Sequence, residues 1–374
     1  MCNMSITFFE NYLKILNMFL YFAKFLRMKK FFAYSMSFVL FGAFLCSCKQ
    51  IKTFDSFNSM NTYMTVQVFS SNAKKGQEAC DAVRDEICQL EKILSTTISE
   101  SDVFKINNCE QGEVFVHLPV KELLDFSSYM YQKTCGLFNP AIYPLIREWG
   151  FTTENYKIVE QNRINELLPL TNFSKLTVTQ AESENLPIKV HVSDGMQIDF
   201  GGIAKGYAGD KAVEVLCEHG IKSALLDLGG NIQALGKKID GTLWTVGIKC
   251  PWNTEKVACA VKIESKAMVT SGGYERFFVG EDGKRYIHIF DPNTGCPAES
   301  NLESVTIVCA KGVYADSLST SLFVMGKEHA IDFWKSAGDF DFVLITKERE
   351  LVYSAGLSGT IKLIYPFEKV SIIE

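Results

Sequence analysis

The stretch DFGGIAKGY, Asp199 to Tyr207, places three glycines, one carboxylate and one lysine within nine residues. Glycine lets the backbone pass close to a ligand or turn with positive φ. A lysine beside free backbone amides favours an anion, most often a phosphate. An aspartate there would repel a phosphate unless it binds a cation or a hydroxyl group. Taken alone, such a cluster is most often a flexible turn before a helix, so its meaning depends on the surrounding chain.

The neighbouring segments predict that this turn joins a strand to a helix. Residues 189–200 read as a hairpin that turns at Asp194-Gly195 and delivers Asp199 at the end of its second strand. Residues 207–220 have helical spacing of apolar residues and a glycine at the end. A buried strand, 223–236, then enters a second double-glycine turn at 229–230. This order aims the amides of a helix N-terminus at an anion.

The rest of the chain alternates between helical and strand patterns. Apolar spacing predicts helices over 76–95, 119–134 and 314–335, and a strand over 64–69. The half that follows residue 240 is mainly β. Two segments read as turns or loops: 94–107, with Ser101 as a possible N-cap, and 136–151, rich in Gly, Pro and aromatic residues. The pattern predicts an α/β (α+β) fold in which helices pack on mixed sheets.

Size and charge allow a large globular domain and give no support for binding to nucleic acid. The chain has 374 residues, of which 47% are hydrophobic, enough for one large domain or two ordinary ones. The formal net charge is -5, and no basic stripe is visible. We therefore expect no nucleic-acid partner.

The N-terminus has the layout of a bacterial lipoprotein signal. From Met28, two lysines precede an apolar run over 31–45, followed by Leu-Cys-Ser-Cys ending at Cys48. The ending resembles a lipobox, in which the last cysteine is lipidated. The alternative is a transmembrane helix, but the run is short of the roughly 20 residues that a span needs. We expect residues 1–27 to be a mis-assigned extension, 28–47 a signal peptide, 48–58 a tether and 59–374 the functional domain. The protein would then be lipid-anchored to a membrane of the cell envelope, on the periplasmic side.

The candidate chemical groups are few. Asp316 and Thr320 stand four residues apart in a predicted helix, so both could present an oxygen to a hard cation such as Mg²⁺. The spacing alone favours another interpretation of Asp316, an acid facing the dipole at a helix N-terminus. His288 lies on a strand running into a Gly turn, where function is often found, but a lone histidine on a strand is more often a hydrogen-bonded core or rim residue than a base. Lys205, standing alone, would be a surface lysine. P-loop, dinucleotide-fold, serine-hydrolase and zinc-protease motifs are absent from the sequence.

Twelve cysteines give no metal or redox motif. Apart from Cys2, Cys46 and Cys48, nine remain, none in a C-x-x-C pair. Their scattered spacing and apolar neighbours indicate mostly buried thiols. The pairing of any disulfide stays open.

Several motifs in one order resemble the ApbE family, the bacterial FAD:protein FMN transferases. Together they cover roughly residues 57 to 357. A series in family order is more specific than any single motif. The matching stretches are MNTYMTV (60–66), LSTTISESDVFKIN (94–107), GLFNPAIYPLIREWGF (136–151), IDFGGIAKGYAGDKA (198–212), LLDLGGNIQALG (225–236), VTSGGYERFF (269–278), YIHIFDPNTGCP (286–297) and ADSLSTSLFVMG (315–326).

The resemblance implies an ApbE-like, T-fold-related domain with a central FAD cleft, and it implies site residues. Mg²⁺ would be held by the backbone carbonyl of Gly202 and the side chains of Asp316 and Thr320. The catalytic residues would be Asp316, Lys205 and, as the base near the acceptor hydroxyl, His288. Asp199 would bind a hydroxyl or amine of the nucleotide. The contacts to FAD would come from Met60, Leu137, Phe138, Asn139, Asp199, Lys205, His288 and Phe290.

The reaction that the resemblance implies moves FMN from FAD onto a Ser or Thr hydroxyl of an acceptor flavoprotein and releases AMP. One alternative is a Mg²⁺-dependent FAD pyrophosphatase, in which water replaces the protein hydroxyl. Another is a non-catalytic flavin-binding lipoprotein, which loss of Asp316 or Thr320 would favour, yet both are present.

Three positions depart from the family pattern. Asn139 stands where an aspartate is usual, Asn61 replaces a glycine, and Thr97 replaces an aromatic residue that can stack on the flavin. These changes bear on flavin affinity more than on metal binding, because Asp316, Thr320 and the GGIAKG turn remain.

Overall fold

The structure, a computed structural model, describes residues 50–109, 112–179 and 188–374. The expected extension, the signal peptide and Cys48 lie outside these residues. The tether expected over 48–58 is wrong for most of its length, because Ile51–Ser59 form strand β1, paired along its whole length with β2 (Thr62–Ser70). In the part of the chain that the structure describes, no helix combines the length and the apolar character needed to cross a bilayer.

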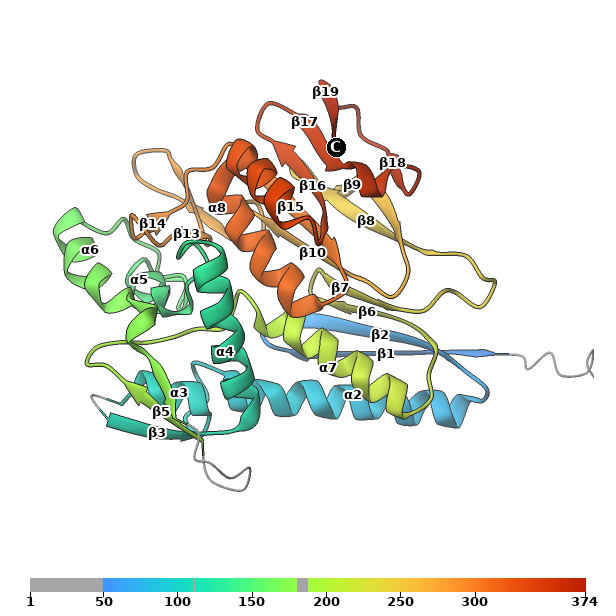
Figure 1. Ribbon diagram of the computed structural model, residues 1–374, viewed down its shortest axis with the longest axis horizontal. Helices are drawn as coiled ribbons and strands as arrows, with labels where there is room; N and C mark the ends of the chain where they lie inside the picture. Colours follow the sequence, from blue (N-terminus) through green and yellow to red (C-terminus); the bar gives the residue numbers. More distant parts are fainter. Residues whose placement is uncertain (1–49, 110–111, 180–187) are drawn as a thin grey trace, which may run out of the picture. The chain divides into compact units, whose positions relative to one another are not determined.

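A nine-stranded sheet forms the centre of the unit 50–374 (Figure 1). All neighbouring strands pair antiparallel except the last two, which pair parallel. The strand order is β1-β2-β6-β7-β10-β15-β16-β17-β19. After β2 these strands are β6 (Ser223–Leu228), β7 (Asn231–Leu235), β10 (Ala267–Gly272), β15 (Leu302–Cys309), β16 (Asp341–Thr346), β17 (Glu350–Ser354) and β19 (Lys369–Ile373).

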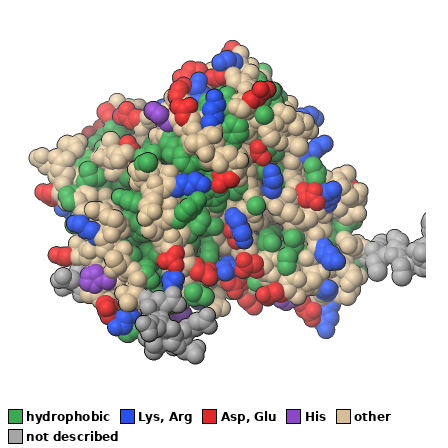
Figure 2. All heavy atoms as spheres, in the orientation of Figure 1, with side chains coloured by type: hydrophobic (Ala, Val, Ile, Leu, Met, Phe, Trp, Pro, Cys, Tyr) green, Lys and Arg blue, Asp and Glu red, His purple; other side chains and the backbone are tan. Residues whose placement is uncertain are grey.

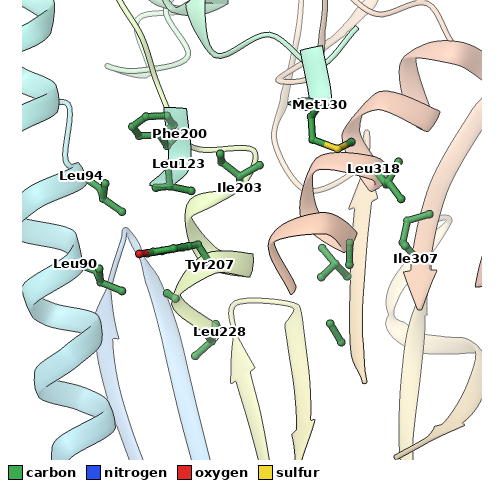
Figure 3. Close-up of a cluster of buried hydrophobic side chains, with 14 of the residues drawn as sticks. Leu90, Leu94, Leu123, Met130, Phe200, Ile203, Tyr207, Leu228, Ile307 and Leu318 are labelled. Atoms are coloured by element: carbon green, nitrogen blue, oxygen red, sulfur yellow. The ribbon is translucent and has the colours of Figure 1, made fainter. Parts of the chain in front are cut away.

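Helices cover one face of this sheet (Figure 1). They are α2 (Ala73–Leu94), α7 (Ala204–Glu218) and α8 (Gly312–Ala337), with α4 (Leu118–Lys133) packed beside them. Leu90 of α2, Tyr207 of α7 and Leu318 of α8 belong to one buried cluster, which Figure 3 shows. The helical spacing of apolar residues in the sequence is what forms this core.

A separate apolar cluster lies between the other face of the large sheet and a second, smaller sheet. The order of the smaller sheet is β18-β9-β8, formed by β8 (Trp244–Cys250), β9 (Asn253–Ile263) and β18 (Ile361–Leu363). Met268 and Val308 of the large sheet face this cluster, whereas their neighbours Val269 and Ile307 face the helices. Successive side chains of a strand point to opposite faces, so the large sheet is buried on both sides.

The remaining elements frame the region in front of α7 and α8. A three-stranded sheet of order β3-β5-β4 lies beside α4, and a third cluster, of aromatic and aliphatic side chains, packs against two small hairpins. These elements are α3 (Asp102–Asn107), β3 (Gly112–Val116), η1 (Pro140–Ile142), α5 (Tyr143–Glu148), α6 (Gln161–Leu167), η2 (Leu168–Thr171), η3 (Phe173–Lys175), β4 (Thr177–Thr179), β5 (Ile188–Val192), β11 (Phe277–Val279), β12 (Arg285–Ile287), β13 (Phe290–Asp291), β14 (Cys296–Pro297) and η4 (Ala355–Leu357).

The predicted long helices and most strands are confirmed, and three local predictions are wrong. The segment 94–107 ends in helix α3, although Ser101 does cap it by accepting from the Phe104 amide at 2.9 Å. The expected loop 136–151 contains η1 and α5. The expected hairpin over 189–200 forms only its first strand, β5, and residues 196–200 are irregular.

The nine cysteines of the described residues are free thiols. Four of them are buried, so the expectation of mostly buried thiols is met only in part. On the face shown in Figure 2, acidic and basic side chains are interspersed.

Candidate functional site

The first double-glycine turn, Gly201-Gly202, lies just before α7, and the second, Gly229-Gly230, joins β6 to β7. Phe200 accepts hydrogen bonds from the amides of Ile203 and Ala204, which starts α7 directly after Gly201-Gly202. In the second turn, Gly229 and Gly230 have φ of +67° and +92°, a backbone conformation that glycine adopts without strain. A side chain at Gly229 would also collide with Thr62 of β2. The sequence therefore needs glycine here for the turn itself.

The carboxylate of Asp316 is buried between α7 and α8. Its Oδ2 accepts a hydrogen bond from the Gly206 amide at 2.9 Å, and the residue is 5% exposed. Burial raises the pKa of this carboxyl, while Lys205, the Gly206 amide and Asn231 act in the opposite direction. Helix-dipole stabilisation at the α8 N-terminus comes instead from Asp210, which accepts from the Gly312 amide at 2.8 Å. The interpretation of Asp316 as the acid that stabilises the N-terminus of α8 is therefore not supported.

Thr320 lies close to Gly202 and Asp316 in a way that suits a hard cation. A Cβ placed on Gly202 would stand 3.9 Å from the Thr320 hydroxyl oxygen, so the glycine backbone and Thr320 are neighbours. The Ser271 hydroxyl lies 3.4 Å from that oxygen and 2.8 Å from the Ser319 hydroxyl. A carboxylate, a hydroxyl and a backbone carbonyl are the oxygen ligands that Mg²⁺ prefers.

Within residues 50–109, 112–179 and 188–374, no group of three or more His, Cys, Asp or Glu side chains forms a metal cluster. A Mg²⁺ ion held by Asp316, Thr320 and the Gly202 carbonyl would therefore take its other ligands from water or from substrate phosphates. Mg²⁺ sites in proteins are commonly of this kind. The donor set fits the expected ion.

Asp199 and the loop 137–140 lie side by side. The Asp199 amide donates to the Pro140 carbonyl at 2.9 Å, and its Oδ1 accepts from the Gly201 amide at 3.0 Å. Burial raises the pKa of Asp199, and Lys205 and Arg276 counteract part of this shift. The ring of Phe138 reaches the other glycine of the turn, 3.4 Å from a Cβ placed on Gly202. The structure therefore brings these predicted cofactor contacts together.

Asn139 is held by the fold itself. Its Oδ1 accepts from the Ala141 amide and its Nδ2 donates to the Thr171 carbonyl, both at 2.9 Å. An aspartate could cap η1 equally well but could not donate to the Thr171 carbonyl. The departure from the family pattern thus has a structural role in this chain.

His288 lies near Arg276 and Lys205, the two cations that also act on Asp199. Its backbone amide and its Nδ1 both lie 3.1 Å from the Arg276 carbonyl. Burial lowers the pKa of His288 to about 4, and the nearby cations Arg276 and Lys205 add to this effect. The charge of Lys205 also acts on Asp199 and Asp316, so this lysine is near all three groups.

Phe290 and Met60, both predicted to contact the cofactor, make contacts within the protein itself. The ring of Phe290 is 5% exposed and packs edge-on against Trp149 and Phe151, so it belongs to the aromatic core. Met60 has φ of 50°, and its amide donates to Glu91 Oε1 at 2.8 Å. Its turn lies beside Gly229-Gly230, because the strands that follow and precede these turns, β2 and β6, are paired.

The sequence analysis missed Arg276 and Asn231. Arg276 lies in the VTSGGYERFF stretch and is near both Asp199 and His288. Asn231 directly follows the second double-glycine turn and acts on Asp316. Asn231 is the first residue of β7 and Arg276 directly precedes β11, and only the packing of distant segments reveals their partners.

A hollow of about 460 Å³ lies on a different side of α7. Its walls include Tyr129 of α4, Tyr207 of α7 and Tyr314 of α8. It shares none of the predicted catalytic or metal-binding residues. The predicted catalytic groups therefore gather outside this hollow.

Comparison with known proteins gives a consistent result. A model of the ApbE family matches residues 60–344. The FAD:protein FMN transferase of Treponema pallidum (strain Nichols) is 32% identical over 317 residues, 82% of this chain and 87% of the relative. That of Klebsiella pneumoniae (strain 342) is 30% identical and covers 80% of this chain and 93% of the relative.

Solved structures show the same fold. An ApbE protein from Thermotoga maritima has a TM-score of 0.72 and 29% identity, covering 84% of this chain and 97% of its own. The flavinyl transferase ApbE from Pseudomonas stutzeri, in its apo form, has a TM-score of 0.71 and 28% identity, covering 80% and 92%. The predicted fold class, helices packed on mixed sheets as in ApbE proteins, is confirmed.

Proposed function

This chain belongs to the ApbE family, and we propose on that basis that it is a FAD:protein FMN transferase that uses Mg²⁺ and releases AMP. The observation that carries the proposal is the meeting of Asp316, Thr320 and Gly202 with Lys205 and His288 at one site. The family match covers all five residues. Oxygen ligands for a metal ion, a cation and a neutral imidazole are groups that can serve phosphoryl transfer to a hydroxyl.

The reaction forms one phosphorus–oxygen bond and breaks another. The acceptor hydroxyl oxygen attacks the phosphorus on the FMN side of the FAD pyrophosphate, and the bond to the AMP phosphate breaks. The hydroxyl proton passes to His288, and AMP leaves with the bonding electron pair. When bound, Mg²⁺ neutralises the phosphate oxygens and the charge on the leaving group.

The protein residues supply orientation and charge. The Lys205 ammonium lies among Asp199, His288 and Asp316 and so favours a polyanion at this position. Asp199, with its amide fixed to Pro140, is placed to accept from a hydroxyl or amine of the nucleotide. The Arg276 carbonyl can only accept, so the Nδ1 of neutral His288 carries the proton and Nε2 is left with a free lone pair.

The proposal extends to location. The lipoprotein-like signal ending at Cys48 supports export and lipid anchoring at the cell envelope. The acceptor would then be an exported flavoprotein that presents a Ser or Thr hydroxyl. The mass of the N-terminal fragment of the protein, isolated from cells in which lipoprotein processing is intact, tests this part. A mature chain that begins at Cys48 with attached lipid is expected, and an unlipidated soluble chain would contradict it.

The activity is tested with purified protein, FAD, Mg²⁺ and an acceptor that carries a Thr-containing flavinylation motif. We expect the acceptor to gain the mass of one FMN while AMP is released, and we expect Asp316→Ala to abolish both. His288→Ala should lower turnover by about 10²–10⁴-fold at saturating FAD and Mg²⁺. Unchanged turnover in that variant would remove His288 from its assigned role.

Two other outcomes distinguish the alternatives. Free FMN and AMP without acceptor modification, also with a second acceptor protein, would identify a FAD pyrophosphatase. Tight FAD binding without any turnover would identify a flavin carrier.

A further inference from the structure

Asn231 carries an unpaired hydrogen-bond donor in the interior of the protein. It is 6% exposed, and its Nδ2 has no hydrogen-bond partner in the structure. Among the described residues, only Ser127 and Ser304 share this property. A buried donor without a partner costs about 1–3 kcal/mol, so a protein that retains one needs a reason.

The strand places this amide opposite the carboxylate of Asp316. Gln233, two residues further along β7, points to the same face and donates to Asp210, which caps the first turn of α8 through Gly312. Asp316 lies one helical turn beyond Gly312 and accepts from Gly206, one turn before Asp210. Asn231 lies two residues before Gln233 on the same face of β7, toward the Gly229-Gly230 turn. Its side chain therefore lies next to the hydrogen bond between the Gly206 amide and the Asp316 carboxylate.

The electrostatics of Asp316 agree with this placement. The Asn231 side chain acts to lower the pKa of the Asp316 carboxyl, against the larger effect of burial. The amide is therefore beside the carboxylate, although the two groups do not have the geometry of a hydrogen bond. Only the charged carboxylate would gain fully from a second donor.

We propose that Asn231 is a positioning residue, whose Nδ2 donates to the Asp316 carboxylate when that carboxylate binds a divalent cation together with FAD. This inference rests on the proposed function. The Gly206 amide holds Oδ2 of the carboxylate, and Asn231 supplies the second donor that fixes its rotation. With both donors in place, a lone pair of the carboxylate stays aimed toward Gly202 and Thr320.

Groups that orient a metal ligand commonly change metal affinity by about 10–100-fold when they are removed. Asn231→Leu keeps a similar volume and removes the donor. We therefore expect FAD binding in this variant to need about 10-fold more Mg²⁺ than in the wild type. The melting temperature of the metal-free protein should not fall, because an unpaired buried polar group has been replaced by an apolar one.

The experiment measures FAD affinity by quenching of flavin fluorescence over a Mg²⁺ titration, without any acceptor protein. Ser127→Ala is the matched control, since Ser127 is a buried residue of α4 that also has an unpaired hydroxyl. It should leave the Mg²⁺ dependence unchanged. Asn231→Asp should also weaken binding at low Mg²⁺, because it places a second negative charge beside Asp316 without a donor.

The outcomes separate the two proposals. If the wild type binds FAD with a clear Mg²⁺ dependence and Asn231→Leu keeps it unchanged, the role of Asn231 is overturned. A fall in melting temperature without a change in Mg²⁺ dependence would likewise identify Asn231 as purely structural. If the wild type itself binds no FAD at any Mg²⁺ concentration, the proposed function fails, and this inference fails with it.

Discussion

His288 shows how a single backbone contact prepares a side chain for proton transfer. Its Nδ1 lies 3.1 Å from the Arg276 carbonyl, and Arg276 and Lys205 stand close by. Burial lowers the pKa of the ring to about 4, so it is neutral at physiological pH. The phosphates of a bound nucleotide would offset the two cations and raise the pKa toward the range where a base is most effective.

The low pKa of His288 gives a testable dependence of stability on pH. In the unfolded chain a histidine titrates near 6.5, whereas in the folded protein this ring takes up a proton only near 4. Between these values the unfolded state binds more protons, so the contribution of His288 to the free energy of unfolding rises with pH. We expect wild type to gain more stability from pH 4.5 to 7 than His288→Asn.

Urea unfolding of both proteins at the two pH values measures this difference. His191→Asn is a suitable control, because His191 is exposed on β5. Equal pH dependence in wild type and His288→Asn would show that the ring titrates normally.

At the scale of elements, the crossing of α7 and α8 determines the position of Asp316. The helices meet where Gly206 faces Gly312, and a Cβ on Gly206 would lie 2.2 Å from the Gly312 carbonyl oxygen. It would also lie 2.8 Å from the Asp316 Cβ. The absence of a side chain at this position allows the Gly206 amide to reach the carboxylate.

Gly206→Ala should therefore separate the two helices and weaken the hold on Asp316. The new methyl group would contact backbone that cannot rotate away, so we expect a loss of about 1–3 kcal/mol in the free energy of unfolding. Mg²⁺-dependent FAD binding should fall as well. Thermal unfolding and flavin fluorescence measure the two effects.

Gly209→Ala in the same helix is the control. A Cβ there would meet its nearest neighbour at 3.6 Å, an ordinary contact, and alanine favours helix by up to about 1 kcal/mol. We expect equal or higher stability and unchanged binding. If the two variants behave alike, the close approach at Gly206 is not what positions Asp316.

The local sequence predicts helices and strands well where buried residues recur periodically, and poorly where contacts with distant parts of the chain determine the local structure. Helices α2 and α8 follow from their apolar spacing, but β1 is largely polar and reads as a tether, because only one of its edges is paired. The second strand expected after Asp194-Gly195 does not form. Instead, the Ile198 amide and carbonyl bond to the Asn107 side chain at 2.7 and 2.8 Å.

At the scale of the whole molecule, the candidate site draws on residues far apart in the sequence. The turn at Gly202, the strand end at His288 and the helix positions Asp316 and Thr320 meet because α7 and α8 pack together on one sheet. The residue types and the family resemblance predicted these participants. Their distances, and the partners Arg276 and Asn231, depend on long-range packing that no local pattern contains.

The buried carboxylate of Glu350 links three elements, β17, β19 and α8. Glu350 of β17 accepts from Lys369 and Ser371 of β19 and from Lys327 of α8, at 2.8, 2.7 and 3.1 Å. These contacts, above all the one with Lys369, lower the pKa of Glu350 to about 2. Among the described strands of the large sheet, β17 and β19 form the one parallel pair, and parallel pairing is slightly less stable per residue, so β19 benefits from this additional contact.

Glu350→Gln should loosen this junction and leave Lys327 without its buried partner. We expect a loss of about 1–2 kcal/mol in the free energy of unfolding at pH 7. Because the folded pKa lies below the unfolded value near 4.5, the contribution of Glu350 is present above that pH and is lost as the pH falls toward 2. The difference between wild type and variant should narrow between pH 5 and pH 3. Glu113→Gln, at an exposed pair with Lys189, should change the free energy of unfolding far less, because water and salt screen an exposed ion pair. A difference that stays constant with pH would mean that packing of the side chain, rather than its charge, holds β19 to the sheet.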